Sequence, residues 1–256
     1  MSYLSNNLQS NNLLINGMSI KYYLSTLLSS YKFNHAFFTK DCSRFPIKQL
    51  AKKFNNNKIN YFNTQIHSNF IVSGSNIVNG EKFEADGILG EKSNQNLWIY
   101  SADCMPILFA DKSSRLVSAI HCGRKGLEKK IINRIVNKMV NFGSLKQNIL
   151  VAIGPSISKV NYLVDDKCLK TFYKNIFSKV NSELIFNPKY IYKHSENSYF
   201  LDLKGYAFHQ LLSNDIFPEN IEILKLCTYE LEDQFYSWRR DKTIKRNWNF
   251  ITSKLI

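Results

Sequence analysis

Short apolar segments separated by polar turns dominate this chain from residue 35 onward. The segments are rich in Ile, Val, Phe and Tyr, a composition that is typical of strands in a partly buried sheet. The pattern predicts strand and strand–turn segments over residues 35–40, 61–68, 69–74, 97–100, 106–111, 115–122, 148–153, 198–203, 221–229, 234–241 and 247–255. The core of the protein is therefore expected to contain a large share of β-structure.

Between these segments the apolar period changes to that of a helix. The clearest case follows Gly126, where Leu127, Ile131, Ile135 and Met139 recur every four residues and the charged residues lie outside the stripe. Gly143 is placed to end this helix in a left-handed conformation. Further helices are predicted over residues 19–30, over 165–180 with Asp165 or Asp166 as N-cap, and over 204–214 with Asp202 as N-cap.

The order of these elements predicts a single α/β domain with helices packed outside a mixed sheet. Residues 1–30 are polar, rich in Asn and Ser, and weakly patterned, so we expect a loosely ordered N-terminal arm there. Residues 31–256 are expected to form the domain, and the chain length of 256 residues suits one large core.

Composition narrows the class of protein. The formal net charge is +14, but the lysines are scattered along the chain, so we expect no nucleic-acid partner and instead a local basic pocket for a phosphate-bearing ligand. No apolar run is long enough to span a bilayer, and the N-terminus lacks the pattern of a secretory signal. The expectation is a cytoplasmic protein without a membrane partner. The five cysteines are widely spaced and form no CxxC pair, which disfavours a disulfide framework.

The stretch "SADCMPILFADKSSRLVSAIHCGRKG" places two reactive residues, Cys104 and His121, near the ends of consecutive strands. Successive side chains on a strand point to opposite faces, so Cys104 is favoured over Asp103, and His121 over Cys122. His67 in "TQIHSNF" is the third candidate. One chemistry is a zinc site in which these three residues leave one coordination position open. The other is a Cys104 nucleophile with His121 as its general base, and spacing alone leaves both open.

Basic residues near the reactive pair and near the C-terminus are candidates for anion binding. An arginine can hold phosphate or carboxylate with a planar fork, whereas a lysine acts as a point charge. Aromatic residues beside the arginines offer a face to a planar ligand. The candidates for binding phosphate are Lys125, Arg239, Arg240 and Arg246.

Taken together, these motifs resemble the YfiH family, also called the laccase-domain or multicopper polyphenol oxidoreductase family and the purine nucleoside phosphorylase family. The matching stretches are "HAFFTK", "TQIHSNF", "FEADGILG", "SADCMPILFAD", "SAIHCGRKGL", "AIGPSISKVNYLV", "FLDLKG" and "FYSWRRDKTIKRN". They cover nearly the whole chain from residue 35 to residue 250.

The resemblance implies a layered α/β/β/α sandwich and metal ligands at His67, Cys104 and His121. It implies a zinc enzyme that phosphorolyses adenosine, inosine and methylthioadenosine and deaminates adenosine, or a copper-dependent polyphenol oxidase. It also implies a monomer or weak homo-oligomer. The chain departs from the family at "HCGRKG", where the pattern is usually H-A-G-W-R-G, so Arg124 and Lys125 stand at the Trp and Arg positions. A metal-free Cys–His hydrolase and a non-enzymatic binding protein remain as alternatives.

Overall fold

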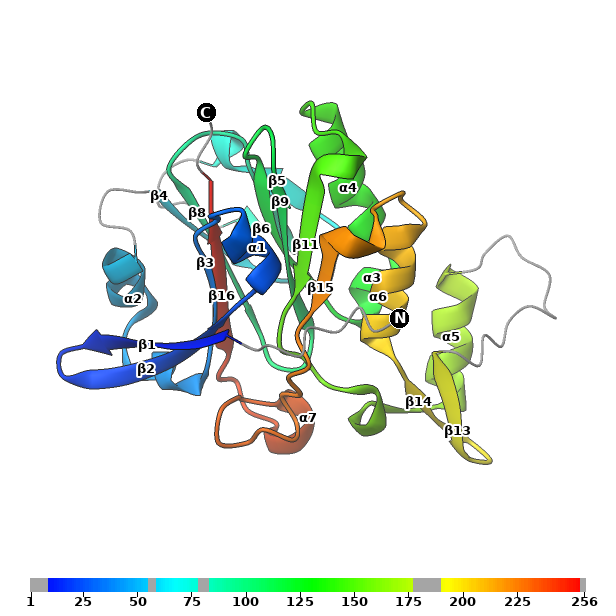
Figure 1. The fold of residues 1–256 in the computed structure, drawn as a ribbon. Coiled ribbons are helices and arrows are strands. Elements are labelled where there is room, and N and C mark those ends of the chain that lie inside the picture. Colours follow the sequence, from blue (N-terminus) through cyan, green and yellow to red (C-terminus); the bar gives the residue numbers. More distant parts are fainter. Residues whose placement is uncertain (1–8, 55–58, 78–82, 177–189, 254–256) are drawn as a thin grey trace.

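A computed structural model describes residues 9–54, 59–77, 83–176 and 190–253 of the chain. Strands and helices are interspersed along the chain, with a run of strands from residue 59 to residue 122 that no α-helix interrupts among the described residues (Figure 1). The strands are β1 (Gln9–Ile15), β2 (Met18–Leu24), β3 (His35–Phe38), β4 (Ile59–Thr64), β5 (Ile71–Ser73), β6 (Phe83–Glu84), β7 (Gly87–Gly90), β8 (Gln95–Ser101), β9 (Met105–Asp111), β10 (Val117–Cys122), β11 (Ile149–Ile153), β12 (Leu163–Asp165), β13 (Ile191–Ser195), β14 (Ser198–Leu201), β15 (Ile221–Ile223) and β16 (Asn247–Thr252). The α-helices are α1 (Thr26–Ser30), α2 (Ile47–Phe54), α3 (Arg124–Glu128), α4 (Ile131–Asn141), α5 (Asp166–Ile176), α6 (Leu203–Leu212) and α7 (Trp238–Asp241).

Within the described residues the strands form two large sheets and one small sheet. One large sheet has the order β1-β2-β3-β16-β8-β4-β6, and the other has the order β15-β11-β9-β10-β7-β5. The small sheet has the order β12-β14-β13. Parallel and antiparallel pairs occur in both large sheets, so the predicted mixed α/β class is confirmed.

The two large sheets pack face to face and are covered by helices on their outer faces (Figure 1). A buried cluster that includes Leu97 and Ile99 of β8 and Leu108 of β9 fills the space between the sheets. The outer face of the second sheet packs against α3, α4 and α6, and the outer face of the first packs against α2. This arrangement is the predicted α/β/β/α sandwich.

The N-terminal part of the chain corrects two predictions. Residues 9–30 are not a loose arm and 19–30 are not one helix, because β1 and β2 form a hairpin that adds to the first sheet and α1 follows it. Asn16 and Gly17 form the turn with φ of 50° and 78°, as a tight hairpin requires. Residues 1–8 lie outside the described residues, and a single domain over 31–256 remains a prediction.

The helix predicted from residue 127 is present but is interrupted. Lys130 adopts a left-handed φ of 57° and separates α3 from α4. The predicted apolar stripe is buried, and Gly143 has a φ of 95° just after the helix ends. The N-terminal caps of α5 by Asp165 and of α6 by Asp202 are confirmed, whereas residues 177–180 of the predicted helix lie outside the described residues.

The segment at residues 234–241 also differs from the prediction, because it ends in helix α7 and not in a strand. Ser237 caps this helix by accepting a hydrogen bond from the backbone N–H of Arg240. Among the described residues, no helix combines the length and apolar character that a membrane span requires.

Candidate metal centre

The antiparallel pair β9–β10 brings Cys104 and His121 to one end of the second sheet. His121 lies opposite Pro106 in the register, and Cys104 immediately precedes β9. Cys104 therefore lies in the turn between β8 and β9, where strand alternation does not apply. Asp103 in the same turn has a left-handed φ of 88°, and it lines the same cavity as Cys104. The cluster contains Cys104 and not Asp103, as expected, but the turn separates the two side chains and strand alternation does not.

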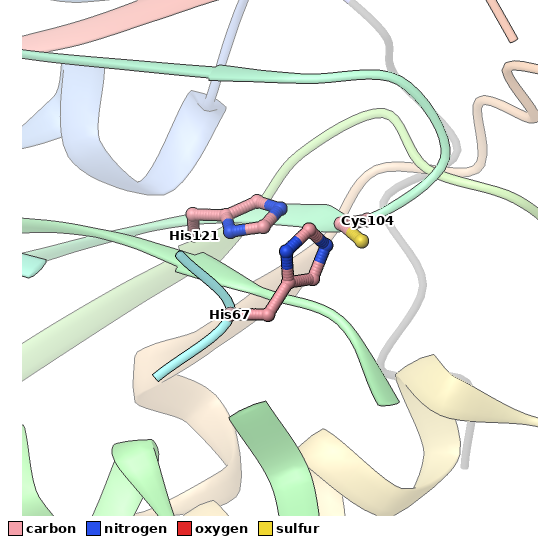
Figure 2. Close-up of side chains that lie close together, drawn as sticks. All are labelled: His67, Cys104 and His121. Carbon is pink, nitrogen blue, oxygen red and sulfur yellow. The ribbon is translucent and has the colours of Figure 1, made fainter. Parts of the chain in front are cut away.

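His67 reaches the same point from the loop after β4. Figure 2 shows the three side chains directed toward one another. One ligand atom from each of His67, Cys104 and His121 lies within 4.8 Å of the others. The two imidazole rings meet edge to face with their centroids 4.9 Å apart. The fold thus brings together the three residues that the sequence nominated.

Gly123 lets the chain pass close to the cluster. A Cβ atom at this position would lie 2.4 Å from the Cys104 sulfur, inside any permitted contact distance. A side chain there would force the Cys104 sulfur out of its present position. The Gly after His121 and Cys122 is therefore a steric requirement of the site.

Asp86 holds two of the candidate ligands in place, a role that the sequence interpretation missed. Its fully buried carboxylate lies 2.9 Å from His121 Nδ1 and accepts hydrogen bonds from the backbone N–H groups of His67 and Ser68. Because Nδ1 is occupied, His121 presents Nε2 to the cluster. A carboxylate behind a ligating histidine fixes the ring orientation and raises the basicity of the ligand.

Electrostatic coupling changes the charge state of the three groups. Burial would raise the pKa of Cys104, but His121 and His67 outweigh it and lower the pKa to about 6. Burial would lower the pKa of His121, but Cys104 and Asp86 outweigh it and raise the pKa to about 9. Burial would also raise the pKa of Asp86, but hydrogen bonds from His121 and Ser68 lower it to about 2. Near neutral pH the cluster holds a thiolate, the form that binds metal.

The reactivity of Cys104 is expected to depend on pH and on metal. In metal-stripped protein, its alkylation rate by iodoacetamide should rise through a midpoint near pH 6, whereas an ordinary thiol titrates near pH 8.5. Saturation with Zn²⁺ should slow the reaction strongly, because a ligated thiolate is no longer free to attack. Mass spectrometry of the alkylated peptide measures this rate.

A matched variant identifies the sulfur that reacts. Cys104→Ala should remove the fast phase, because burial raises the pKa of Cys42 and of Cys122. A rate that keeps rising toward pH 9, or one that Zn²⁺ leaves unchanged, would contradict the assignment. The second outcome would favour the metal-free Cys–His hydrolase.

The three candidate ligands lie at a cavity of about 610 Å³, within the usual range for small-molecule sites. The first group of lining residues is aromatic, namely Tyr100, Tyr162 and Trp238. The second group is cationic, namely Arg124, Lys125, Arg239 and Arg246. Among the described lining residues, Asp103 supplies the acidic group. The cavity therefore suits a planar ligand together with an anion.

Three of the four predicted phosphate-binding residues, Lys125, Arg239 and Arg246, line this cavity. The guanidinium of Arg239 lies 4.9 Å from the ring centroid of Tyr162 and donates to the carbonyl of Leu163. Arg124 joins them, although the sequence marked it only as a departure from the family pattern. Its partner Glu128, one helical turn later, holds the guanidinium in an ion pair.

Arg240 has a different environment from the one predicted. Its two Nη atoms donate to the backbone carbonyls of Thr228, Tyr229 and Phe235, and its guanidinium also pairs with Asp241. These bonds hold the loop before α7, and Arg240 does not line the cavity. We therefore assign it to the stability of this loop and not to phosphate binding.

Arg240→Met is expected to lower the free energy of unfolding by at least about 2 kcal/mol, since carbonyls lose charged hydrogen-bond donors. Urea denaturation measures this change. Arg44→Met is the matched control, because Arg44 forms a surface pair with Asp41 and should change stability by less than about 1 kcal/mol. If Arg240→Met leaves stability intact but weakens phosphate binding, the assignment is wrong.

The residues present fit a transition metal. A thiolate with two imidazoles is a typical shell for Zn²⁺, and three protein ligands leave one position open. The carboxylate of Asp86 supplies the outer-shell partner that such a site needs. The donor set thus supports a metal centre, while copper also binds nitrogen and sulfur ligands and competes strongly for them.

Comparison with known proteins identifies relatives of this chain. The profile of the family described as "Multi-copper polyphenol oxidoreductase laccase" matches residues 36–254. A purine nucleoside phosphorylase from Rickettsia prowazekii is 34% identical over 185 residues, which cover 72% of each chain. One from Clostridium acetobutylicum is 30% identical over 211 residues, covering 81% of this chain and 82% of the relative.

Solved structures share the fold. The crystal structure of the hypothetical protein YfiH from Bacillus licheniformis superposes with a TM-score of 0.77 at 24% identity, covering 91% of this chain and 96% of the other. The crystal structure of YlmD from Geobacillus stearothermophilus gives a TM-score of 0.70 at 26% identity, with 81% and 78% coverage.

Proposed function

Because this chain belongs to the family described as multi-copper polyphenol oxidoreductase laccase, whose curated relatives include purine nucleoside phosphorylases, we propose that it phosphorolyses purine nucleosides. The observation that carries the proposal is the joint position of His67, Cys104 and His121 at a cavity lined by cations and aromatic rings. The cationic side chains would bind the phosphate, and the aromatic rings would pack against the purine base. We propose adenosine, inosine and methylthioadenosine as the substrates.

In the proposed arrangement, Lys125, Arg239 and Arg246 hold phosphate, and the guanidinium of Arg124 adds a further donor. The aromatic side chains of Trp238 and Tyr162 contact the base. A phosphate oxygen attacks the ribose C1′ and the bond from C1′ to the base nitrogen breaks, giving ribose 1-phosphate. Holding both reactants in one cavity in the right orientation lowers much of the activation barrier, because less entropy is lost in the reaction step.

The departing base needs a proton or a hydrogen-bond donor. Tyr162 lines the cavity, and burial raises its pKa to about 12, so it remains a neutral phenol that can donate. Zn²⁺ held by His67, Cys104 and His121 would supply a Lewis acid that polarises a substrate oxygen. Asp86 keeps the His121 ring oriented throughout.

Deamination of adenosine is the second activity that we propose for this site. Zinc deaminases of nucleobases also use a shell of histidine and cysteine ligands. Of the described groups near the cluster, Asp86 is fully engaged in hydrogen bonds and is not available as a proton carrier. Zinc deaminases use a carboxylate as general acid and base, and Asp86 is not free for that role, so we expect deamination to be slower than phosphorolysis.

The test is a nucleoside panel assayed with native protein purified without added metal. We expect adenine and ribose 1-phosphate from adenosine only when phosphate is present, and inosine as a minor product. The Cys104→Ala protein is the control. No product above that control would overturn the proposal, and several bound copper ions with phenol oxidation would favour the polyphenol oxidase instead.

Lys125→Ala should raise the KM for phosphate about tenfold with a smaller effect on the KM for the nucleoside. The loss of one point-charge contact corresponds to about 1.4 kcal/mol of binding free energy. Steady-state kinetics at varied phosphate measures this. Lys138→Ala, on α4 and not among the residues that line the cavity, is the matched control and should behave as wild type. Equal changes in both KM values would contradict the assignment.

A further inference from the structure

Asp103 connects the turn that carries Cys104 to the opposite wall of the cavity. The residue is 7% exposed, and its φ of 88° is uncommon for a residue other than glycine. Such backbone conformations persist where surrounding contacts hold them in place. The contacts of Asp103 therefore indicate what this conformation serves.

Both oxygens of the Asp103 carboxylate accept hydrogen bonds from one distant segment, residues 228–239. Oδ1 accepts a hydrogen bond of 2.7 Å from the hydroxyl of Thr228, which is fully buried. Oδ2 accepts a hydrogen bond of 2.6 Å from the backbone N–H of Arg239 in α7. The carbonyl of Asp103 accepts a third bond from the N–H of Ile157. A carboxylate in this position is thus a fixed link and not a free base.

The segment held by this link forms a wall of the cavity. Helix α7 starts with Trp238, which is half exposed, and Arg239, and both line the cavity. The side chain of Arg239 is fixed at its other end by the carbonyl of Leu163 and the ring of Tyr162. Arg239 is therefore anchored at its backbone by the Cys104 turn and at its guanidinium by the far side of the cavity.

We propose that Asp103 is a positioning residue that sets Trp238 and Arg239 at a fixed distance from the metal-ligand cluster. This role rests on the proposed phosphorolysis, in which Arg239 holds phosphate while Cys104 lies on the adjacent turn. The left-handed backbone at Asp103 directs its carboxylate toward α7, while the next residue directs its sulfur toward the histidines. One turn thereby fixes two parts of the site relative to each other.

Asp103→Asn tests the role with little change in size, because asparagine also tolerates a left-handed backbone. Its amide offers one acceptor oxygen where the carboxylate offers two, so the Thr228 hydroxyl must either lose its bond or turn to accept from the amide N–H. In both cases the charged acceptor that holds the backbone N–H of Arg239 is lost. We expect the KM for phosphate to rise about tenfold or more, with a smaller change in kcat and an unchanged metal-to-protein ratio. Thr228→Val should act in the same direction more weakly, and Thr228→Ser should restore wild-type values.

Acrylamide quenching of Trp238 fluorescence gives a readout that does not depend on turnover, with Trp238→Phe defining the signal. Asp103→Asn should increase quenching because α7 loses its anchor. Wild-type KM and quenching in a folded Asp103→Asn protein would overturn the inference, as would loss of metal in proportion to activity. If wild type shows no phosphorolysis, the proposed function fails while quenching still decides the role of Asp103. If Asp103→Asn does not fold, the comparison of Thr228→Val with Thr228→Ser decides the role of Asp103.

Discussion

Cys104→Ala is expected to lower kcat/KM for phosphorolysis by more than about 100-fold, beyond the usual cost of losing an outer-shell partner of a metal. The substitution removes the thiolate from the cluster and leaves two imidazoles, of which His121 has lost the negative charge that raises its pKa. The loss of the thiolate weakens metal binding, because two imidazoles alone hold a metal less tightly than two imidazoles with a thiolate. Steady-state kinetics and metal analysis of the same preparation measure the effect.

A second cysteine gives the matched control for this variant. Cys168 lies half-buried on α5 and is not among the residues that line the cavity. Cys168→Ala should keep the activity and the metal content of wild type. A Cys104→Ala protein that retained full turnover would show that the reaction does not depend on the cluster.

Asp86→Asn is expected to lower metal affinity by about 10- to 100-fold, the usual range for an outer-shell partner of a ligating histidine. The neutral amide lacks the negative charge that holds His121 Nδ1. In addition, the amide NH2 group replaces one carboxylate oxygen and is a donor, so it cannot accept from the backbone N–H groups that this oxygen accepted from. Disrupting this buried pair should also lower the free energy of unfolding by about 3–5 kcal/mol. Competition with a chelating dye measures the affinity, and urea denaturation measures the stability.

Asp111→Asn separates the two effects. Asp111 is another buried carboxylate that accepts backbone N–H groups, but it lies at the far end of β9. This control should lose stability and keep its metal affinity. If Asp86→Asn bound metal as wild type does, the proposed support of His121 by Asp86 would be wrong.

The free energy of unfolding of the native protein should also depend on pH through the charge of Asp86. The folded pKa of about 2 lies below the ordinary value of about 3.9, so its stabilising effect is present above about pH 4. The effect is lost as the pH falls through about 2. In Asp86→Asn this part of the acid sensitivity should be absent, and urea midpoints measured between pH 5 and pH 2 compare the two proteins.

The three candidate ligands were predictable from the sequence because each is a reactive residue type in a distinctive motif. Asp86 was not, since its sequence signal is only an Asp before a Gly in "FEADGILG". Its role arises when β7 and the loop of His67 come together around one carboxylate. Strand alternation and residue spacing do not predict contacts between segments that lie far apart in the chain.

The N-terminal hairpin had a usable signal that composition obscured. The pair Asn16-Gly17 is the strongest short turn signal for a two-residue hairpin, and Ile15 and Ile20 on either side are fully buried. The surrounding Asn and Ser residues favoured a loose arm instead. Short-range turn chemistry was a better guide here than average polarity.

The C-terminal arginines show a case in which the sequence holds no signal that could have corrected the prediction. Arg239 and Arg240 are adjacent and chemically identical, but only Arg239 lines the cavity. The four-residue helix α7 turns the two side chains in different directions, and Ser237 caps it. A sequence that reads as β-type in this segment gives no basis for separating them.

The most direct test of the central claim is ³¹P NMR of native protein incubated with inosine and inorganic phosphate. A cluster of His67, Cys104 and His121 that supports phosphorolysis should convert free phosphate to ribose 1-phosphate in step with the release of hypoxanthine, and Cys104→Ala should not. Base release that consumes no phosphate, or equal conversion by Cys104→Ala, would contradict the account.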